Sequence, residues 1–128
     1  MAVLDASFLA DVDRGDPAAS MLLGALADEG RPLVVPAPVL LALLTAARDP
    51  ARAFGELEAR LDLAPFGPEE AARAAAVARA ARRKGKAPGW LACAAAGAAL
   101  HRGEPLVTGE AEAFRGVEGL EVVTYRRS

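Results

Sequence analysis

The chain has 128 residues, of which 53% are hydrophobic and 25% are charged. This composition excludes a disordered chain, and the length fits a single domain spanning residues 1–128. The net charge of −2 argues against a generally basic nucleic-acid-binding protein, but it leaves room for a local basic patch.

The first dozen residues predict a short buried strand followed by a helical turn. Residues 2–4 are apolar, and Asp5 stands at the end of this run. Ser7 is expected to cap a helical turn through residues 8–9. Ligands of α/β sheets bind beyond the carboxyl ends of the strands, so Asp5 is either part of an active site or a local capping acid.

The rest of the chain alternates between helical and strand patterns. Asp16 and Pro17 form a helix start, and that helix is expected to bury Met21, Leu22, Ala25 and Leu26. The patterns predict helices over 17–28, 37–47, 50–61, 68–84 and 88–102, strands over 33–35, 104–108 and 121–125, a connecting or edge strand over 63–66, and a helical turn over 109–115. This order predicts a three-layer α/β/α sandwich with a mostly parallel sheet.

The single cysteine and the lack of a long apolar segment bear on the location of the protein. Cys93 is the only cysteine and lies in an alanine-rich segment, which is typical of a buried thiol in a reducing cytoplasm. No signal peptide is visible, and the nearly uncharged segment 87–100 is too short to span a bilayer. We therefore expect a cytoplasmic protein without a membrane partner.

Four segments, taken in chain order, carry a resemblance to a known family. They read VLDASFLAD near the start, VVPAPVLLALL before the paired helices, GWLACAAAGAALHRGEPLVTGE in the second half, and GLEVVTY near the end. Together they resemble the PIN-domain family, most closely its VapC-like toxin branch, from one end of the chain to the other. The resemblance implies a single PIN-like domain.

The resemblance also implies a chemistry. Such proteins are metal-dependent ribonucleases in which three or four carboxylates hold Mg²⁺ or Mn²⁺, and the metal polarises the scissile phosphate and activates a water. The first acid falls on Asp5, and the next two fall on positions that hold Ala42 and Ala92 here. The fourth falls near Glu110, in a turn that also holds Glu112 and is about one residue longer than the family pattern.

Three functions follow as hypotheses. The leading one is a catalytically impaired PIN-domain protein that acts as a binding or structural partner and needs no cofactor. The second is an active Mg²⁺- or Mn²⁺-dependent endoribonuclease. Its metal ligands would be Asp5, Glu110 and Glu112, with Asp5 and Glu110 catalytic and the hydroxyls of Ser7 and Thr108 in support. The third is RNA binding without cleavage.

The candidate RNA-binding residues are Arg79, Arg82 and Arg83, within a basic run towards the end of the helix over 68–84. The alternative is a solvated helix face that complements the helix dipole. Trp90 is interpreted as core or interface packing rather than a base-stacking platform, and His101 as a surface or capping residue.

The partners follow from the resemblance. The helices over 37–47 and 50–61 correspond to those that, in related toxins, form homodimers and bind an antitoxin. We therefore predict a homodimer, with an antitoxin protein and RNA as further possible partners.

Overall fold

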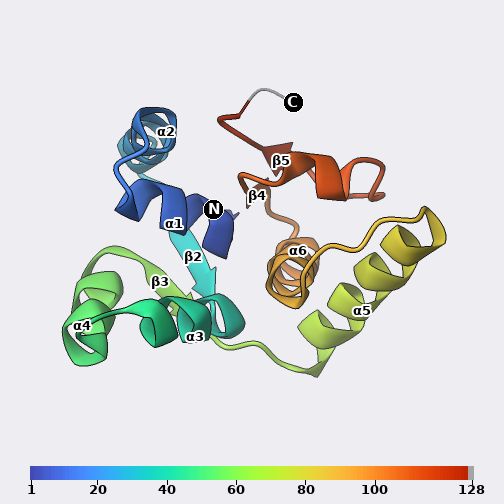
Figure 1. Ribbon diagram of the computed structural model, residues 1–128, viewed down its shortest axis with the longest axis horizontal. Helices are drawn as coiled ribbons and strands as arrows, with labels where there is room; N and C mark the ends of the chain where they lie inside the picture. The colour runs from blue at the N-terminus through green and yellow to red at the C-terminus, as the bar shows by residue number, and fades with distance from the viewer. Residues whose placement is uncertain (127–128) are drawn as a thin grey trace.

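The computed structural model describes residues 1–126, which form a five-stranded sheet with six α-helices (Figure 1). The strands are β1 (Ala2–Leu4), β2 (Leu33–Pro36), β3 (Asp62–Ala64), β4 (Leu106–Val107) and β5 (Val122–Val123). The helices are α1 (Ala6–Asp13), α2 (Pro17–Asp28), α3 (Ala37–Ala46), α4 (Pro50–Arg60), α5 (Pro68–Arg83) and α6 (Trp90–Arg102), and a 3₁₀ turn, η1, covers Ala111–Phe114. The predicted elements are confirmed, with ends shifted by a few residues.

The sheet has the strand order β3-β2-β1-β4-β5, and all of its strand pairs are parallel. Successive strands lead outward from β1 to β2 and β3, whereas β4 returns to the other side of β1. The boundary between β1 and β4 is therefore the topological switch point, where open α/β sheets bind their ligands.

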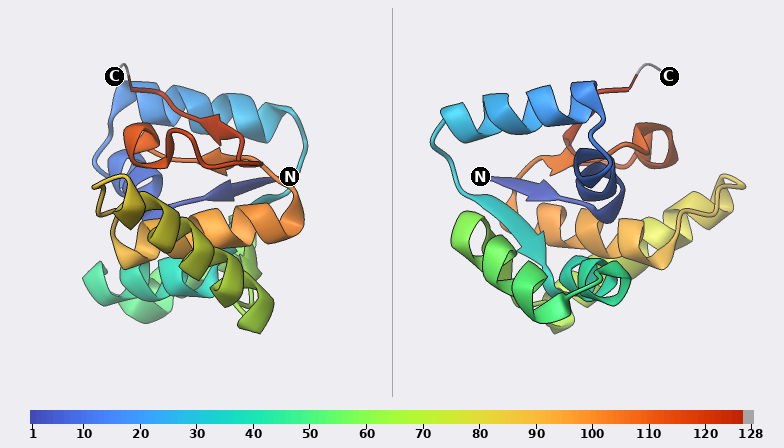
Figure 2. Two further views of the ribbon diagram at one scale, coloured as in Figure 1. Left: turned by 90° about the vertical axis from the view of Figure 1, so that its right-hand side faces the viewer. Right: turned by 60° about the vertical axis from the view of Figure 1, so that its left-hand side comes forward.

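Helices cover both faces of the sheet (Figure 2). In both views α2 lies on one side of the strands, and α6 lies on the other side together with α3 and α5. The three-layer prediction is therefore confirmed. The buried centre is built from strand residues that the sequence shows as continuous apolar runs, as expected for a parallel sheet covered on both faces.

The alanine-rich helix α6 packs closely against α5. Gly97 lies where a Cβ atom would stand only 2.6 Å from the backbone nitrogen of Ala74 and from the carbonyl oxygen of Glu70. Small side chains let the two helix backbones approach, and most of α6 is buried as a result.

The buried face of α2 differs from the prediction. Met21 is 76% exposed, and Ala25 is also exposed. The residues that face the core are instead Ala19, Leu22, Leu23 and Leu26. The predicted and the observed residues both have helical spacing. The observed ones are those on the face of α2 that packs against the core, so the prediction for Met21 and Ala25 was wrong.

Candidate functional site

Asp5 lies at the switch point of the sheet. It follows β1 directly, and Thr108 follows β4 directly, with Leu4 of β1 in register with Val107 of β4. The backbone N–H of Asp5 donates to the carbonyl oxygen of Val107 at 3.1 Å. Parallel pairing thus brings together two polar residues that are 103 positions apart in the sequence.

The carboxylate of Asp5 is satisfied by its own chain. One oxygen accepts from the Ser7 hydroxyl at 2.8 Å and from the backbone N–H of Phe8 at 2.9 Å. The other oxygen accepts a short hydrogen bond from the Thr108 hydroxyl. Asp5 is therefore the N-cap of α1, and the prediction that Ser7 caps this helix was wrong because the helix begins at Ala6.

The two hydroxyls tie the capping acid to the turn after β4. Ser7 Oγ accepts from the backbone N–H of Gly109 at 3.0 Å, and Thr108 Oγ1 accepts from that of Glu110 at 2.9 Å. Each hydroxyl can therefore donate its single proton to Asp5 while it accepts from the backbone. The result is a closed polar network with no buried side-chain polar atom left unsatisfied within residues 1–126.

Burial controls the protonation of Asp5. Loss of water around the carboxylate raises its pKa above the usual value, and the hydrogen bonds from Thr108, Phe8 and Ser7 only partly oppose this. All of these donors are neutral. Within residues 1–126, no basic side chain forms an ion pair with Asp5.

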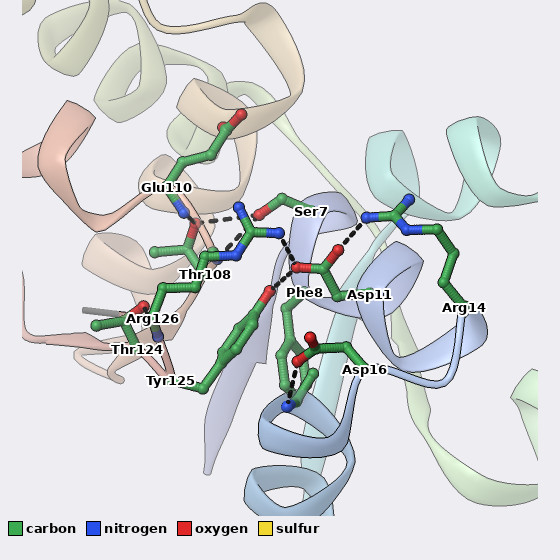
Figure 3. Close-up of polar contacts among 12 residues, drawn as sticks. Ser7, Phe8, Asp11, Arg14, Asp16, Thr108, Glu110, Thr124, Tyr125 and Arg126 are labelled. Atoms are coloured by element: carbon green, nitrogen blue, oxygen red, sulfur yellow. Dashed lines mark hydrogen bonds and ion pairs between the residues drawn. The ribbon is translucent and has the colours of Figure 1, made fainter. Parts of the chain in front are cut away.

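The other candidate acids do not join Asp5. The side chains of Glu110 and Glu112 are exposed, and Figure 3 shows the Glu110 carboxylate directed away from Ser7 and Thr108. Glu112 forms an ion pair with Arg115 at 2.8 Å. The structure therefore brings together Asp5, Ser7 and Thr108, but not the two glutamates.

The two alanine positions lie on the helices that flank the sheet. Ala42 is half-buried in α3, and Ala92 is buried in the first turn of α6. Among the residues that the structure describes, no group of three or more His, Cys, Asp or Glu side chains could hold a metal ion. Mg²⁺ prefers several hard oxygen ligands and usually one or two carboxylates, so one buried and fully hydrogen-bonded aspartate does not fit it.

A second buried acid, Asp11, was missed by the sequence analysis. Its carboxylate accepts from the Tyr125 hydroxyl and forms ion pairs with Arg14 and Arg126, all at short range (Figure 3). The Tyr125 ring packs against Phe8, with ring centres 5.4 Å apart. The signal was weak: Asp11 follows Phe8 by three residues and so shares its buried face on α1.

The partners of Asp11 fix its charge. The Tyr125 hydrogen bond, together with the nearby Arg126 and Arg14, lowers the pKa of Asp11 despite its burial. Burial and the Asp11 carboxylate conversely raise the pKa of Tyr125. Asp11 is thus a charged acid paired with Arg14 and Arg126, whereas Asp5 has no ion pair within residues 1–126.

The candidate RNA-binding residues Arg79, Arg82 and Arg83 are all exposed on α5. The guanidinium of Arg82 lies over the ring of Trp90, with its carbon 5.4 Å from the ring centre. Trp90 is 74% exposed, which contradicts core packing, and packing at an interface stays a prediction. It occupies the first position of α6, before the buried part of that helix begins.

The predicted burial of Cys93 and the predicted surface position of His101 are confirmed. Cys93 is buried with 2% exposure, and burial raises the pKa of its thiol. His101 is exposed, with Nε2 lying 3.5 Å from a carboxylate oxygen of Glu69 and 3.8 Å from one of Glu70. Within residues 1–126, no helix is long and apolar enough to cross a lipid bilayer.

Comparison with known proteins identifies the family. The profile of the PIN domain matches residues 2–120, nearly the whole chain. The chain therefore belongs to the PIN-domain family, and its five-stranded parallel sheet with six helices is the PIN fold. No curated protein gives a significant match.

Solved structures of toxin–antitoxin complexes share the fold. VapBC-1 from nontypeable Haemophilus influenzae has a TM-score of 0.82 at 15% identity, with 98% of each chain covered. A toxin–antitoxin complex from Klebsiella pneumoniae has a TM-score of 0.77 at 18% identity, with 100% of each chain covered. VapBC2 from Rickettsia felis, bound to a promoter DNA fragment, has a TM-score of 0.77 at 16% identity, with 98% of each chain covered. At these identities the likeness concerns the fold alone.

Proposed function

We propose that this protein is a VapC-like PIN-domain protein that is impaired in metal-dependent RNA cleavage and acts by binding partners. The observation that carries the proposal is the set of oxygen donors at the switch point. Within residues 1–126, no group of three or more metal-ligating side chains forms around Asp5, and Ala42 and Ala92 occupy positions where the family pattern has acids.

Charge supports this proposal. Negative charge from several carboxylates offsets the cost of partly dehydrating Mg²⁺, and here a single carboxylate is offered. Burial also raises the pKa of Asp5, so the surroundings of this carboxylate disfavour its charged form. The Ser7 and Thr108 hydroxyls donate their protons to Asp5 and each accept one backbone N–H, so each keeps one lone pair for a cation but adds no negative charge.

The alternative function, an active endoribonuclease, requires Glu110 and Glu112 to move. Both would have to turn from solvent towards Asp5, and Glu112 would have to give up its ion pair with Arg115. An exposed ion pair of this kind stabilises the chain by at most about 1 kcal/mol, so the movement is energetically accessible. Experiment must separate the two functions.

The test is a titration with Mn²⁺, followed by electron paramagnetic resonance, together with a cleavage assay on single-stranded RNA. The proposal predicts no saturable Mn²⁺ binding and intact RNA. It is overturned by RNA cleavage that Asp5→Ala abolishes, or by a bound Mn²⁺ that Glu110→Gln releases.

A gain-of-function variant sharpens the same test. The double variant Ala42→Glu with Ala92→Asp places acids at both positions, and we expect it to bind Mn²⁺ more tightly than the natural chain. Ala46→Glu is the matched control because it adds one carboxylate at an exposed position of the same helix, α3. Equal Mn²⁺ affinity of the double variant and the control would contradict the proposal that missing acids limit the site.

The proposed partners are a second copy of the chain and an antitoxin-type protein, since the structures with this fold come from toxin–antitoxin complexes. Apolar side chains on α3 and α4 support this proposal: Leu41 is 67% exposed and Phe54 is 39% exposed. We expect Leu41→Glu to shift a dimer to a monomer in light scattering and Phe54→Glu to weaken an antitoxin complex. Met21→Glu, on α2, is the control and should change neither.

A further inference from the structure

A mostly apolar hollow lies between α5, the end of α6 and the segment around η1. Its volume of about 410 Å³ is within the range of small-molecule sites. Figures 1 and 2 both place η1 beside the C-terminal end of α5. The apolar side chains that line the hollow are all alanine, valine or leucine, so they offer an aliphatic surface to a ligand.

The hollow is elongated along α5. Ala76 and Ala80 lie about one turn apart on this helix, and so do Val77 and Ala81, so all four line the same side of the hollow. Lys84 follows Ala80 by about one more turn and also lines the hollow. From Ala76 to Lys84 the helix axis rises about 12 Å. The apolar surface is therefore long and narrow, and it leads to a lysine.

Positive charge gathers at the end of the hollow where α5 ends. Arg83, Lys84 and Lys86 line it there, and the two ammonium groups donate to backbone carbonyl oxygens around η1 at 3.3 and 3.2 Å. None of the three forms an ion pair with a carboxylate within residues 1–126. Arg115 also lines the hollow, but it is paired with Glu112. Three positive charges are thus available to an anion.

The opposite end of the hollow is apolar and has an acid at its rim. Leu100 lies at this end, because the next residue, His101, is 3.8 Å from Glu70 in the first turn of α5. Glu118 lies nearby, since a Cβ atom on the residue after it, Gly119, would stand 3.7 Å from Leu100 Cδ2. Glu118 repels a negative group at this end, so the hollow accepts an anionic ligand in one direction.

We propose that the hollow binds a medium-chain carboxylate. The aliphatic chain lies along α5, and the carboxylate meets Arg83, Lys84 and Lys86. An extended chain of about eight to ten carbons matches the length of the apolar surface. Burial of its methylene groups provides affinity, and the cations select the negatively charged end.

The apolar surface favours this ligand over an acidic peptide. A peptide would place backbone polar groups against alkyl side chains that offer them no hydrogen-bond partner. The inference goes beyond the proposed function because it involves neither a metal nor RNA. Its outcome is independent of Mn²⁺ binding at Asp5.

The test uses decanoate and the full-length protein. Binding is measured by isothermal titration calorimetry and by displacement of anilinonaphthalene sulfonate, an aromatic anion that fluoresces in apolar sites. We expect saturable binding of one decanoate per chain, at least about ten-fold tighter than decanol or decyltrimethylammonium, because only decanoate brings a negative group to the cations. Octanoate should bind about five- to ten-fold more weakly than decanoate, because it buries two fewer methylene groups.

Variants locate the ligand within the hollow. Ala80→Leu fills the apolar surface and should weaken decanoate binding about ten-fold. Ala72→Leu adds the same side chain at an exposed position of α5 outside the hollow, and it should leave the affinity within about two-fold of the natural chain. These two variants form a matched pair, since both carry the same substitution on the same helix.

A second variant tests the charged end. Lys84→Met with Lys86→Met keeps two long apolar side chains and removes both ammonium groups. It should reduce the advantage of decanoate over decanol at least about five-fold. Binding of decanol itself should persist, which shows that the variant still folds and keeps the apolar surface.

Four outcomes contradict the proposal. Two are the absence of saturable decanoate binding and an equal loss of affinity in Ala80→Leu and Ala72→Leu. A third is displacement of anilinonaphthalene sulfonate by polyglutamate but not by decanoate, which would assign the hollow to an acidic protein partner. The fourth is binding to phosphatidylglycerol vesicles without binding of free decanoate, which would assign the hollow to a membrane surface.

Discussion

The N-terminal segment contains two aspartates that are equally buried and behave in opposite ways. Asp5 and Asp11 are each only 2% exposed. The pKa of Asp5 is raised, with burial as the main cause, whereas the pKa of Asp11 is lowered, with the Tyr125 hydrogen bond as the main cause. The difference lies in the partners, since Asp5 meets neutral donors and Asp11 also meets two guanidinium groups.

The comparison separates a structural acid from a candidate site acid. Asp11 joins α1 to the chain that follows β5, with its countercharge supplied from within the molecule. Charging Asp5 costs stability, because no basic side chain among the described residues forms an ion pair with it. Asp5 is therefore the candidate site acid, and under the proposed function it lacks the further carboxylates that Mg²⁺ prefers.

The largest effect is expected from Asp11→Ala. Removing this acid leaves the Tyr125 hydroxyl without its acceptor and two arginines without their partner. Loss of one member of a buried charged network costs about 3–5 kcal/mol, and the exposure of Arg14 and Arg126 reduces this to about 3 kcal/mol. Urea unfolding would measure it, with the exposed Asp13→Ala as the control. Equal stability of the two variants would contradict a structural role for Asp11.

Asp5→Ala should cost less, about 1–2 kcal/mol, because two effects oppose each other. The variant loses the N-cap of α1 and leaves the Ser7 and Thr108 hydroxyls without their acceptor. It also removes a buried charge, which offsets part of that cost. A destabilisation as large as that of Asp11→Ala would show that Asp5 is as structural as its neighbour, and urea unfolding of both variants decides this.

Tyr125→Phe should destabilise the protein by about 1 kcal/mol, since it removes one hydrogen bond to a charged group but keeps the ring packed on Phe8. It also makes the pKa of Asp11 less depressed. The stability that Asp11 contributes is present above its unfolded pKa and is lost as the pH falls through its folded pKa. Acid unfolding of Tyr125→Phe should therefore begin at a higher pH, and an unchanged onset would contradict this account of Asp11.

Local patterns predicted most of the fold and singled out Asp5, but they did not single out Asp11. The apolar run before Asp5 predicted β1 and placed Asp5 at the sheet edge, and short apolar runs bounded by proline or glycine predicted β2 and β4. The meeting of Asp5 with Thr108 followed from the family resemblance and the parallel topology. The cap of α1 was assigned to the wrong residue because a serine and an aspartate two positions apart are both good caps, and the exact end of the strand decides between them.

Long-range contacts account for what the sequence could not predict. The partners of Asp11 lie next to it on α1 or more than 100 residues away, so no local pattern connects Asp11 to Tyr125. Trp90 begins an alanine-rich apolar helix, which suggested burial, yet only the residues after Leu91 face the core. Helical spacing predicts which face of a helix is buried, but the first turn of α6 extends beyond the elements that bury the rest of this helix.

The smallest predicted effect is a stabilisation of the folded protein, whereas the other variants are destabilised. Asp5→Asn keeps an oxygen for Ser7 and Phe8 and places an amide near Thr108 Oγ1, which can accept a hydrogen bond. Because the pKa of Asp5 is raised in the folded state, the folded chain binds the proton more tightly, and stability falls as the pH rises above the unfolded value of 3.8. Asp5→Asn lacks this loss, so it should be more stable than the natural chain at neutral pH by less than about 1 kcal/mol.

The advantage of Asp5→Asn should shrink as the pH falls towards 3.8, whereas Asp11→Asn should be destabilised most at neutral pH. Urea unfolding across this pH range measures both differences, and an Asp5→Asn variant less stable than the natural chain at neutral pH would show that the charge of Asp5 already has a stabilising partner.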